Sequence, residues 1–321
     1  MMNSNIVSFL TSSGIPFEHN ASLAHKTWIK QGGTCALWIS PQDKEQLMAV
    51  CQNLYAYHQD FDVVGQTSNI FFHSTYNPEI VVSTTHVDGY EIGENMIVCD
   101  CGVSVVKLAK KCLSLGYAGF YGLVGLPGTV ASAIFNNASC FDCSLSSMLI
   151  SADVLMPDGT VQSLTKDDFE YTHRSSAFKR REKTGIILSV RLKAEKADDV
   201  KEEYRKSEET VIYRREKQEH HGRNLGSVYA GRKKKNNLRN RLVTFILSNL
   251  SRIRLISDKR KAAKSLYLFL YGYRDLNPYV SDRNLNTFIW KDDAAEAKFM
   301  RYKEFMGKVY DDLVIEIEEK M

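Results

Sequence analysis

The chain has 321 residues, 44% of them hydrophobic and 25% charged, which is an ordinary balance for a globular protein of two or three domains. The formal net charge of +4 is mild and does not indicate a protein that binds nucleic acid over its whole surface. No run of about 18 apolar residues occurs, so we expect no membrane span. The start, MMNSNIVSFLTSSG, lacks the basic segment and the long apolar core of a secretory signal.

The seven cysteines are odd in number and scattered, which is typical of reduced thiols, and we therefore expect a cytoplasmic protein. Cys99 and Cys101 should lie on one face of a strand, and Cys140 and Cys143 form a lone C-x-x-C. Nothing in the sequence joins these pairs into a four-ligand zinc site. The prediction is small buried hydrophobes and no metal; a metal or redox role is the alternative.

The first part of the chain, residues 1–79, reads as helices and short strands. We expect a helix and polar lead-in over 1–25, a strand, tight turn and strand within 25–41, a helix over 43–58, and a short strand before Gly65. The turn from Gly65 to Asn69 joins that strand to another apolar stretch. Small-polar turns of this kind expose several backbone N–H groups in one direction and can hold phosphate oxygens; a plain loop or hairpin is the alternative.

The second part, residues 80–197, begins with apolar–polar alternation typical of meandering strands over 79–105. An amphipathic helix follows, with Lys107, Lys110 and Lys111 on its solvent side. The segment GLVGLPGTVASAIFNNAS, residues 122–139, is unusually rich in small residues. Residues 151–165 predict a hairpin that turns at Pro157-Asp158-Gly159, and GIILSVRLKAE predicts another strand.

The last part, residues 198–321, starts with a highly charged stretch and continues with a basic segment, 231–264, that has interleaved aliphatic residues. We expect a solvated helix pair with buried aliphatics there; the alternative is a weak contact with a partner or an anionic membrane surface. The remaining expectations are a strand in NLNTFIW, a helix over 291–312 with acidic residues first, and a final alternating strand in LVIEIEEK.

Four stretches, in order, resemble the UDP-N-acetylenolpyruvoylglucosamine reductase family, which is usually called MurB. These flavoenzymes belong to the FAD-binding group related to vanillyl-alcohol oxidase. The four stretches are TWIKQGG, VVGQTSNIFF, GLVGLPGTVASAIFNNAS and YTHRSSAFK. The resemblance is good over about residues 25–195, thin over 200–275 and moderate at the end.

The resemblance implies an α+β chain in three parts. Two subdomains, 1–79 and 80–197, would form a PCMH-type FAD-binding fold that holds FAD non-covalently between them, and a smaller α+β substrate domain, 198–321, would follow. Glycines and small residues of the 122–139 segment would let the backbone approach the cofactor where larger side chains would collide. The expected FAD-binding residues are Gly65, Gln66, Thr67, Ser68, Asn69, Gly125, Pro127, Gly128, Thr129, Ala131, Ser132 and Asn137.

The resemblance also implies three catalytic residues. Hydride addition to an enolpyruvyl double bond leaves enolate character that must be stabilised, and the neighbouring carbon must receive a proton. Arg174 aligns with the arginine that grips the enolate, Ser227 in NLGSVY with the serine that donates the proton, and Glu316 with the glutamate that shares the stabilising work. The alternatives are a surface arginine beside Arg180 and Arg181, a common Gly-Ser dipeptide, and an acidic solvent face with Glu318 and Glu319.

The sequence departs from the family at several positions. Gln66 and Thr67 replace glycines, Ala131 and Ser132 replace a Gly-Gly pair, Ser139 replaces another glycine, and His173 stands where Tyr is common. Tyr-Ala-Gly-Arg follows the serine segment where Phe-Lys-Asn-Pro is usual, so a substrate-binding lysine is missing. We expect FAD binding to survive these changes, whereas recognition of the UDP-sugar is less secure.

Three functions remain open. The first is a reductase in which NADPH reduces FAD, and UDP-N-acetylglucosamine enolpyruvate is then reduced to UDP-N-acetylmuramate. The second is a related flavoprotein oxidoreductase with another substrate, such as another nucleotide sugar. The third is a flavin-binding module without turnover whose basic segment docks a partner or an anionic membrane.

Overall fold

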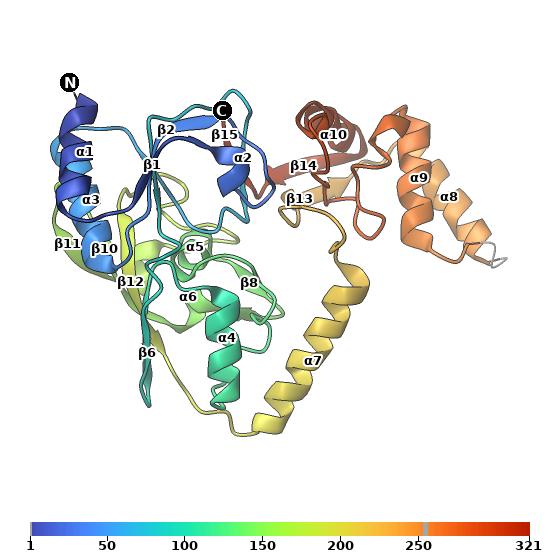
Figure 1. The fold of residues 1–321 in the computed structure, drawn as a ribbon. Helices are drawn as coiled ribbons and strands as arrows, with labels where there is room; N and C mark the ends of the chain where they lie inside the picture. The colour runs from blue at the N-terminus through green and yellow to red at the C-terminus, as the bar shows by residue number, and fades with distance from the viewer. Residues whose placement is uncertain (1, 253–255) are drawn as a thin grey trace. The chain divides into compact units, whose positions relative to one another are not determined.

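A computed structural model describes residues 2–252 and 256–321 as a mixed α+β fold (Figure 1). The α-helices are α1 Met2–Ser12, α2 Leu23–Lys26, α3 Lys44–Ala56, α4 Val105–Ser114, α5 Val130–Asn136, α6 Leu145–Met148, α7 Val200–Lys217, α8 Leu238–Arg252, α9 Lys259–Tyr271 and α10 Ala295–Val309. The strands are β1 Phe17–Ser22, β2 Thr34–Ile39, β3 Asp62–Val64, β4 Ile70–Phe72, β5 Ile80–Ser83, β6 Tyr90–Ile92, β7 Met96–Asp100, β8 Ser139–Cys140, β9 Cys143–Ser144, β10 Leu149–Leu155, β11 Val161–Thr165, β12 Ile186–Lys193, β13 Tyr229–Lys234, β14 Tyr310–Ile315 and β15 Glu318–Lys320. The expected fold class is confirmed.

The chain divides into two compact units that interleave along the sequence. The first unit contains residues up to His25, Thr34–Thr67 and Asn77–Ile212. The second contains Lys26–Gly33, Ser68–Tyr76 and Tyr213–Met321. The functional division into 1–79, 80–197 and 198–321 stays a prediction.

The first unit contains two sheets. One has the strand order β1-β2-β5-β3, in which β2, β5 and β3 are parallel and β1 is antiparallel. The other is antiparallel, with the order β11-β10-β12-β7-β6. Helix α3 packs its buried residues Leu47, Val50, Cys51 and Leu54 against the first sheet, and α1 contributes Ile6 and Leu10 to the same cluster. Helix α4 packs into the core of the second sheet.

Local sequence signals explain several of these elements. The Asp43 carboxylate caps α3 by accepting a hydrogen bond from the Gln46 N–H at 2.7 Å. The expected hairpin is confirmed, because the Met156 N–H donates to the Thr160 carbonyl at 2.8 Å and Gly159 has φ of 83° in the turn. The predicted amphipathic helix is confirmed too, as Lys107, Lys110 and Lys111 of α4 are exposed.

Four expectations for individual segments are wrong. Residues 25–41 contain one strand instead of two, because Leu23–Lys26 is a helical turn. The 79–105 stretch is not one meander, since β5 joins the sheet with β2 and β3 while β6 and β7 belong to the antiparallel sheet. Residues 284–290 contain a turn at Leu285–Asn286 and two isolated bridges in place of a strand, and the final expected strand is broken into β14 and β15.

The second unit has an aromatic core. Phe288 and Trp290 pack edge to face with centroids 5.1 Å apart, and Phe299 lies 4.9 Å from Trp290. Helix α10, which was expected from its spacing, supplies Phe299, Tyr302 and Phe305 to this cluster. Two short pairings complete the unit: β13 with β14, antiparallel, and β15 with β4, parallel.

Six of the seven cysteines are buried in the structure, and Cys140 is half-buried. Cys99 and Cys101 belong to different apolar clusters, because β7 ends at Asp100, so the expectation that they share one strand face is wrong. Burial raises the pKa of the Cys51 thiol to about 12.

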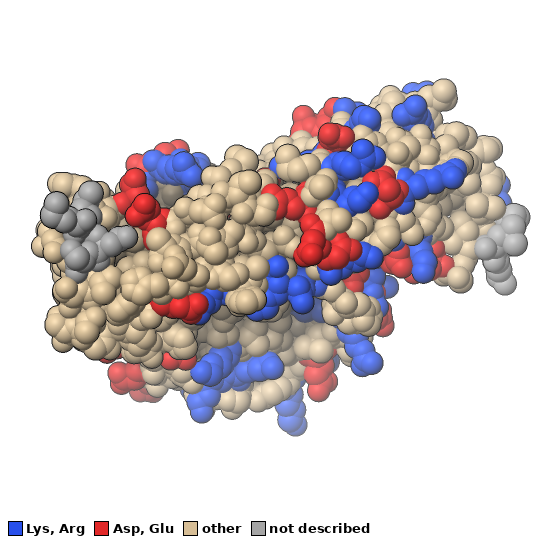
Figure 2. Space-filling model, turned by 45° about the horizontal axis from the view of Figure 1, so that its top comes forward, with Lys and Arg blue, Asp and Glu red and all other residues tan. Residues whose placement is uncertain are grey.

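Within residues 2–252 and 256–321, no group of three or more His, Cys, Asp or Glu side chains is suited to hold a metal ion. Within the same residues, every helix is too short or too polar to cross a membrane. On the face drawn in Figure 2, Lys and Arg are interspersed with Asp and Glu, as the mild net charge leads one to expect.

Candidate functional site

The Gly65–Asn69 loop runs from β3 to β4, as the sequence predicts. Its Thr67 is buried and has φ of 54°, in the left-handed region. The side-chain oxygen Oε1 of Gln66 accepts a hydrogen bond of 3.1 Å from the Gly128 N–H. The loop is therefore tied directly to the small-residue segment 122–139, so two of the four family-like stretches meet within the first unit.

Close packing explains part of the small-residue pattern. A Cβ added at Gly65 would lie 2.7 Å from Oγ1 of Thr129, and one at Gly122 would lie 2.3 Å from the Cys140 carbonyl oxygen. Gly128 has φ of 122°, a conformation that side chains disfavour. Contacts within the protein therefore require small residues at some of these positions, whether or not a molecule is bound.

The Gly128 turn leads into α5. Thr129 is the N-cap of this helix: its N–H donates to Ser132 Oγ at 2.9 Å, and its own Oγ1 accepts from the Ser132 N–H at 3.3 Å. The Val130 N–H donates to the Val103 carbonyl at 2.8 Å. These bonds fix the backbone from Gly128 to Ser132, the part expected to approach FAD most closely.

Arg174 lies in a tight turn beside the end of α5. Thr172 and Ser175 exchange two backbone hydrogen bonds, of 3.0 and 3.1 Å, and Arg174 has φ of 57° between them. The third residue of a four-residue turn with this backbone angle is usually glycine. The half-buried Arg174 at this position therefore carries backbone strain, and strained residues tend to cluster at functional sites.

Side chains on both sides hold this turn in place. Nδ2 of Asn137, the residue that ends α5, donates to the Thr172 carbonyl at 2.8 Å. The buried Ser176 hydroxyl donates to the Phe135 carbonyl at 2.6 Å, and Nζ of Lys179 donates to the Arg174 carbonyl at 3.2 Å. The first unit therefore holds the Arg174 turn against the C-terminal end of α5, whereas the Gly128 turn leads into the N-terminal end of the same helix.

Ser227 and Glu316 meet in the second unit. The Glu316 N–H donates to the Val228 carbonyl at 2.8 Å, next to Ser227, and both Ser227 and Glu316 are half-buried. Nδ2 of Asn69 donates to the Glu316 carbonyl at 3.2 Å, and the Glu318 N–H donates to the Asn69 carbonyl at 2.9 Å. Three residues from distant parts of the sequence are thus held on adjoining backbones.

A half-buried polar cluster around the buried His73, which the sequence did not reveal, lies in the same unit. Nδ1 of His73 is 3.1 Å from Oε1 of Glu296, and its Nε2 is 3.4 Å from Oε2 of Glu319. Lys303 Nζ contacts the same Glu319 oxygen at 2.8 Å. Glu319 is therefore part of a half-buried polar network and not of a solvated acidic face. Only the pairing of β15 with β4 reveals this cluster, since its members are far apart in sequence.

The first unit also retains unsatisfied polar atoms. Among the described residues, the buried Oδ1 of Asn136 and the buried hydroxyl of Tyr171 have no hydrogen-bond partner. Burial raises the pKa of Tyr171, which keeps its hydroxyl protonated and able to donate. An acceptor and a donor next to Asn137 and Thr172, together with the constrained Gly128 backbone, fit a flavin, whose ring edges both donate and accept hydrogen bonds.

Comparison with known proteins agrees with this geometry. Residues 35–165 match the FAD binding domain family. The chain is 28% identical over 211 residues to UDP-N-acetylenolpyruvoylglucosamine reductase of Bacillus pumilus, covering 65% of this chain and 69% of the relative. Against the enzyme of the same name from Halalkalibacterium halodurans the identity is 29% over 211 residues, with the same shares covered. The chain thus resembles the UDP-N-acetylenolpyruvoylglucosamine reductase family, as its sequence motifs predict, and contains an FAD binding domain.

The fold agrees with that family over nearly the whole chain. The crystal structure of UDP-N-acetylenolpyruvylglucosamine reductase (MurB) from Thermus caldophilus superposes with a TM-score of 0.65 at 18% identity, covering 96% of this chain and 100% of that one. The shared fold therefore covers more of the chain than the sequence resemblance does. The family's cofactor is FAD, and the described residues of the first unit are compatible with it.

Proposed function

We propose that this protein is an FAD-dependent reductase that takes electrons from NADPH and reduces UDP-N-acetylglucosamine enolpyruvate to UDP-N-acetylmuramate, a step in making peptidoglycan precursors for the cell wall. The proposal rests on the length of the alignments to relatives that bear this name. These alignments extend over 211 residues or more, well beyond the FAD-binding domain at 35–165.

The cofactor would be held by backbone and uncharged side chains of the 65–69 loop and the 122–139 segment. The hydrogen bond from the Gly128 N–H to Gln66 and the cap at Thr129 support this role, because they fix the two segments against each other. When bound, FAD supplies the hydride. Large side chains are excluded at Gly65 and Gly128 by the distances and backbone angle already described.

Arg174 is proposed to stabilise the enolate that forms beside the substrate carboxylate. A guanidinium is always charged and donates in a plane, which suits a carboxylate or an enolate oxygen. The strained turn and the hydrogen bonds around it support the proposal, since they hold the arginine backbone in one conformation. Preorganised donors of this kind stabilise developing charge without having to reorganise.

Ser227 is proposed to donate the proton to the substrate carbon, and Glu316 to share the stabilising work with Arg174. A hydroxyl is a weak acid, so it needs neighbours that favour its loss of a proton. The backbone hydrogen bond from Glu316 to Val228 supports this assignment, because it holds the backbone of Glu316 beside the residue that follows Ser227.

A second substrate is supported by one specific departure. Where the family places a substrate-binding lysine, the chain reads Tyr229-Ala230-Gly231-Arg232, the start of β13. Another nucleotide sugar is therefore the alternative substrate of the same flavin chemistry.

The test is the visible spectrum of the purified protein, before and after anaerobic addition of NADPH and then of UDP-N-acetylglucosamine enolpyruvate. A flavin band that bleaches and then returns would establish the proposed reaction. Bleaching without return would retain the flavin chemistry and reject this substrate. If no flavin band appears even after FAD is added, the proposal fails.

Two further properties are proposed with this function. We place the protein in the cytoplasm, which its seven scattered and mostly buried cysteines support. We also propose that the basic segment 231–264 makes a weak contact with an anionic surface, which its excess of Lys and Arg supports.

A further inference from the structure

Helix α8 has an exposed apolar face that the core does not use. Leu238, Leu242 and Phe245 follow one another at helical spacings of four and three, so they lie on one face of the helix. Leu238 is 82% exposed, Phe245 67% and Leu242 41%. Leucine and phenylalanine side chains this exposed, gathered on one helix face, mark a surface for interaction.

The opposite face of α8 already anchors the helix. Val243 and Leu247 are buried in the core of the second unit. Nδ2 of Asn240 donates to the Lys235 carbonyl at 2.7 Å and to the Val309 carbonyl at 2.9 Å, and the Tyr271 hydroxyl donates to Asn240 Oδ1 at 2.8 Å. The outward apolar face is therefore not needed to hold α8 in place.

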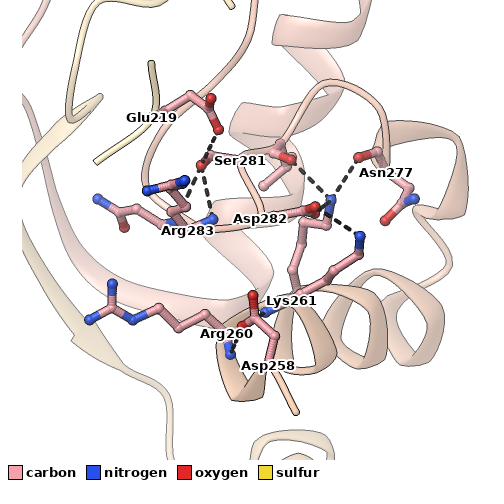
Figure 3. Close-up of polar contacts among 11 residues, drawn as sticks. Glu219, Asp258, Arg260, Lys261, Asn277, Ser281, Asp282 and Arg283 are labelled. Atoms are coloured by element: carbon pink, nitrogen blue, oxygen red, sulfur yellow. Dashed lines mark hydrogen bonds and ion pairs between the residues drawn. The ribbon is translucent and has the colours of Figure 1, made fainter. Parts of the chain in front are cut away.

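The charge around this face is strongly positive. Residues 231–264 contain twelve Lys and Arg and a single acid, Asp258, whereas the whole chain carries a net charge of only +4. Some of these cations are neutralised: Lys264 and Lys261 both pair with Asp282, the latter at 3.2 Å (Figure 3), and Lys235 pairs with Asp311 at 3.4 Å.

The network in Figure 3 fixes α9, which packs beside α8 (Figure 1). The buried Lys264 donates to the carbonyl oxygens of Asn277, at 2.9 Å, and Val280, at 3.2 Å. Asp258 caps α9 by accepting from the Arg260 and Lys261 N–H groups. These contacts hold α9 in place beside α8. The apolar face of α8 and the remaining cations around it therefore lie on an ordered pair of helices.

The arginines of α8 flank the apolar face. By helical position, Arg241 and Arg252 lie along one side of it and Arg239 along the other. Arg239 stacks over the Tyr271 ring at 5.3 Å, and Arg241 donates to Asn236 Oδ1 at 2.9 Å. Within residues 2–252 and 256–321, none of the three forms an ion pair with an acidic side chain.

We infer that α8 docks on an anionic phospholipid bilayer. Leu238, Leu242 and Phe245 enter the boundary between headgroups and acyl chains, and Arg241 and Arg252 reach lipid phosphates beside them. The inference deepens the proposed anionic contact of segment 231–264 and does not depend on the proposed enzymatic reaction.

The same features argue against two other occupants. A nucleic acid would meet the outermost side chains first, and these are leucine and phenylalanine instead of phosphate-binding cations. A second copy would bring two surfaces of the same high positive charge together, which opposes association. An anionic lipid surface offers both phosphate groups for the arginines and acyl chains for the leucine and phenylalanine side chains.

The experiment is co-sedimentation of the full-length protein, as purified, with vesicles of phosphatidylcholine alone and with vesicles that also contain phosphatidylglycerol. We expect binding to the anionic vesicles only. The double variant Leu238→Gln, Phe245→Gln should lower the bound fraction at limiting lipid by about tenfold. In Phe245→Trp, the tryptophan emission should shift to the blue on binding.

Matched variants control for folding and for charge. Ile150→Gln with Val161→Gln removes two exposed apolar side chains elsewhere and should leave vesicle binding unchanged. Arg241→Gln with Arg252→Gln should weaken binding, whereas Lys110→Gln with Lys111→Gln, an equal loss of charge on α4, should weaken it less. Circular dichroism verifies that each variant is folded.

The inference is overturned if the protein ignores anionic vesicles, or if it binds them equally well without Leu238 and Phe245. It is also overturned if the double variant abolishes a dimer seen by light scattering and has no effect on vesicle binding, because the apolar face would then cover a second copy. None of these outcomes bears on whether FAD is bound or reduced.

Discussion

The backbone N–H of Glu316 donates a 2.8 Å hydrogen bond to the carbonyl oxygen of Val228, and this bond ties the proposed glutamate to the residue after the proposed proton donor, Ser227. Asn69 joins the same group through its bond to the Glu316 carbonyl. A displacement of β14 or β15 would therefore move Glu316 and Ser227 together, and the two are best tested as a pair.

Replacing Ser227 with alanine should separate the two half-reactions. Flavin reduction by NADPH should keep its rate, whereas flavin reoxidation by the enolpyruvyl substrate should slow by about a hundredfold to ten-thousandfold, the usual contribution of a positioned proton donor. Anaerobic stopped-flow absorbance measures both steps in the same protein. An equal loss in both steps would instead assign Ser227 a structural role.

Replacing Arg174 with lysine should impair the same oxidative step. Lysine keeps the charge but loses the planar guanidinium, so reoxidation by substrate should slow by about a hundredfold to a thousandfold. Arg181→Lys is the matched control, because Arg181 is also a left-handed residue in this segment, with φ of 62°, and is exposed. If both variants lose activity equally, general electrostatics rather than a specific contact explains the result.

Much of this site follows from local sequence signals. The Pro157-Asp158-Gly159 turn and the caps at Asp43 and Thr129 depend on residues within three positions of one another, so their geometry is encoded locally. The loop before β4 was likewise expected from its small polar residues between two apolar stretches.

Other features depend on partners that only the fold brings together. The stretch from residue 79 reads as alternating strands, yet β5 pairs with β2 and β3 in a parallel sheet, and strand order is set by distant packing. His73 and Glu319 lie 246 positions apart, and only the β4–β15 pairing joins them. A positive φ at Arg174 contradicts the usual preference for glycine, so sequence alone would not place it there.

Replacing Gly128 with alanine should weaken FAD binding. Its φ of 122° disfavours any side chain. The backbone would have to move to accommodate alanine, and this movement would disturb the segment that is hydrogen-bonded to Gln66. We expect a loss of FAD affinity of tenfold or more, which corresponds to about 1.4 kcal/mol, measured by quenching of flavin fluorescence in titrations.

Gly159→Ala is the control for this variant. Gly159 also has a positive φ, 83°, with open space around it, and lies in the hairpin turn between β10 and β11. Both substitutions should lower the free energy of unfolding by about 1–3 kcal/mol through backbone strain. Only Gly128→Ala should lower FAD affinity; equal losses of affinity would show that stability alone controls cofactor binding.

The pair Asp153–Arg191 makes the first unit sensitive to acid. The guanidinium donates to both carboxylate oxygens, at 2.9 and 3.0 Å, across the central strands β10 and β12. This hydrogen bonding holds the pKa of Asp153 below its ordinary value of 3.8. Since the folded pKa is depressed, the contribution to stability is complete above pH 3.8 and is lost as the pH falls through the folded value.

Asp153→Asn should therefore lower the free energy of unfolding at neutral pH by about 1–2 kcal/mol, a figure reduced by the partial exposure of Arg191. Below the depressed folded pKa of Asp153 the two proteins should converge, because the wild-type carboxyl becomes protonated there. Urea unfolding followed by circular dichroism at both pH values measures the difference, with the exposed Asp60→Asn as control. A difference that stays constant into acid would mean that Asp153 stabilises the sheet through its shape and neutral hydrogen bonds, without a contribution from its charge.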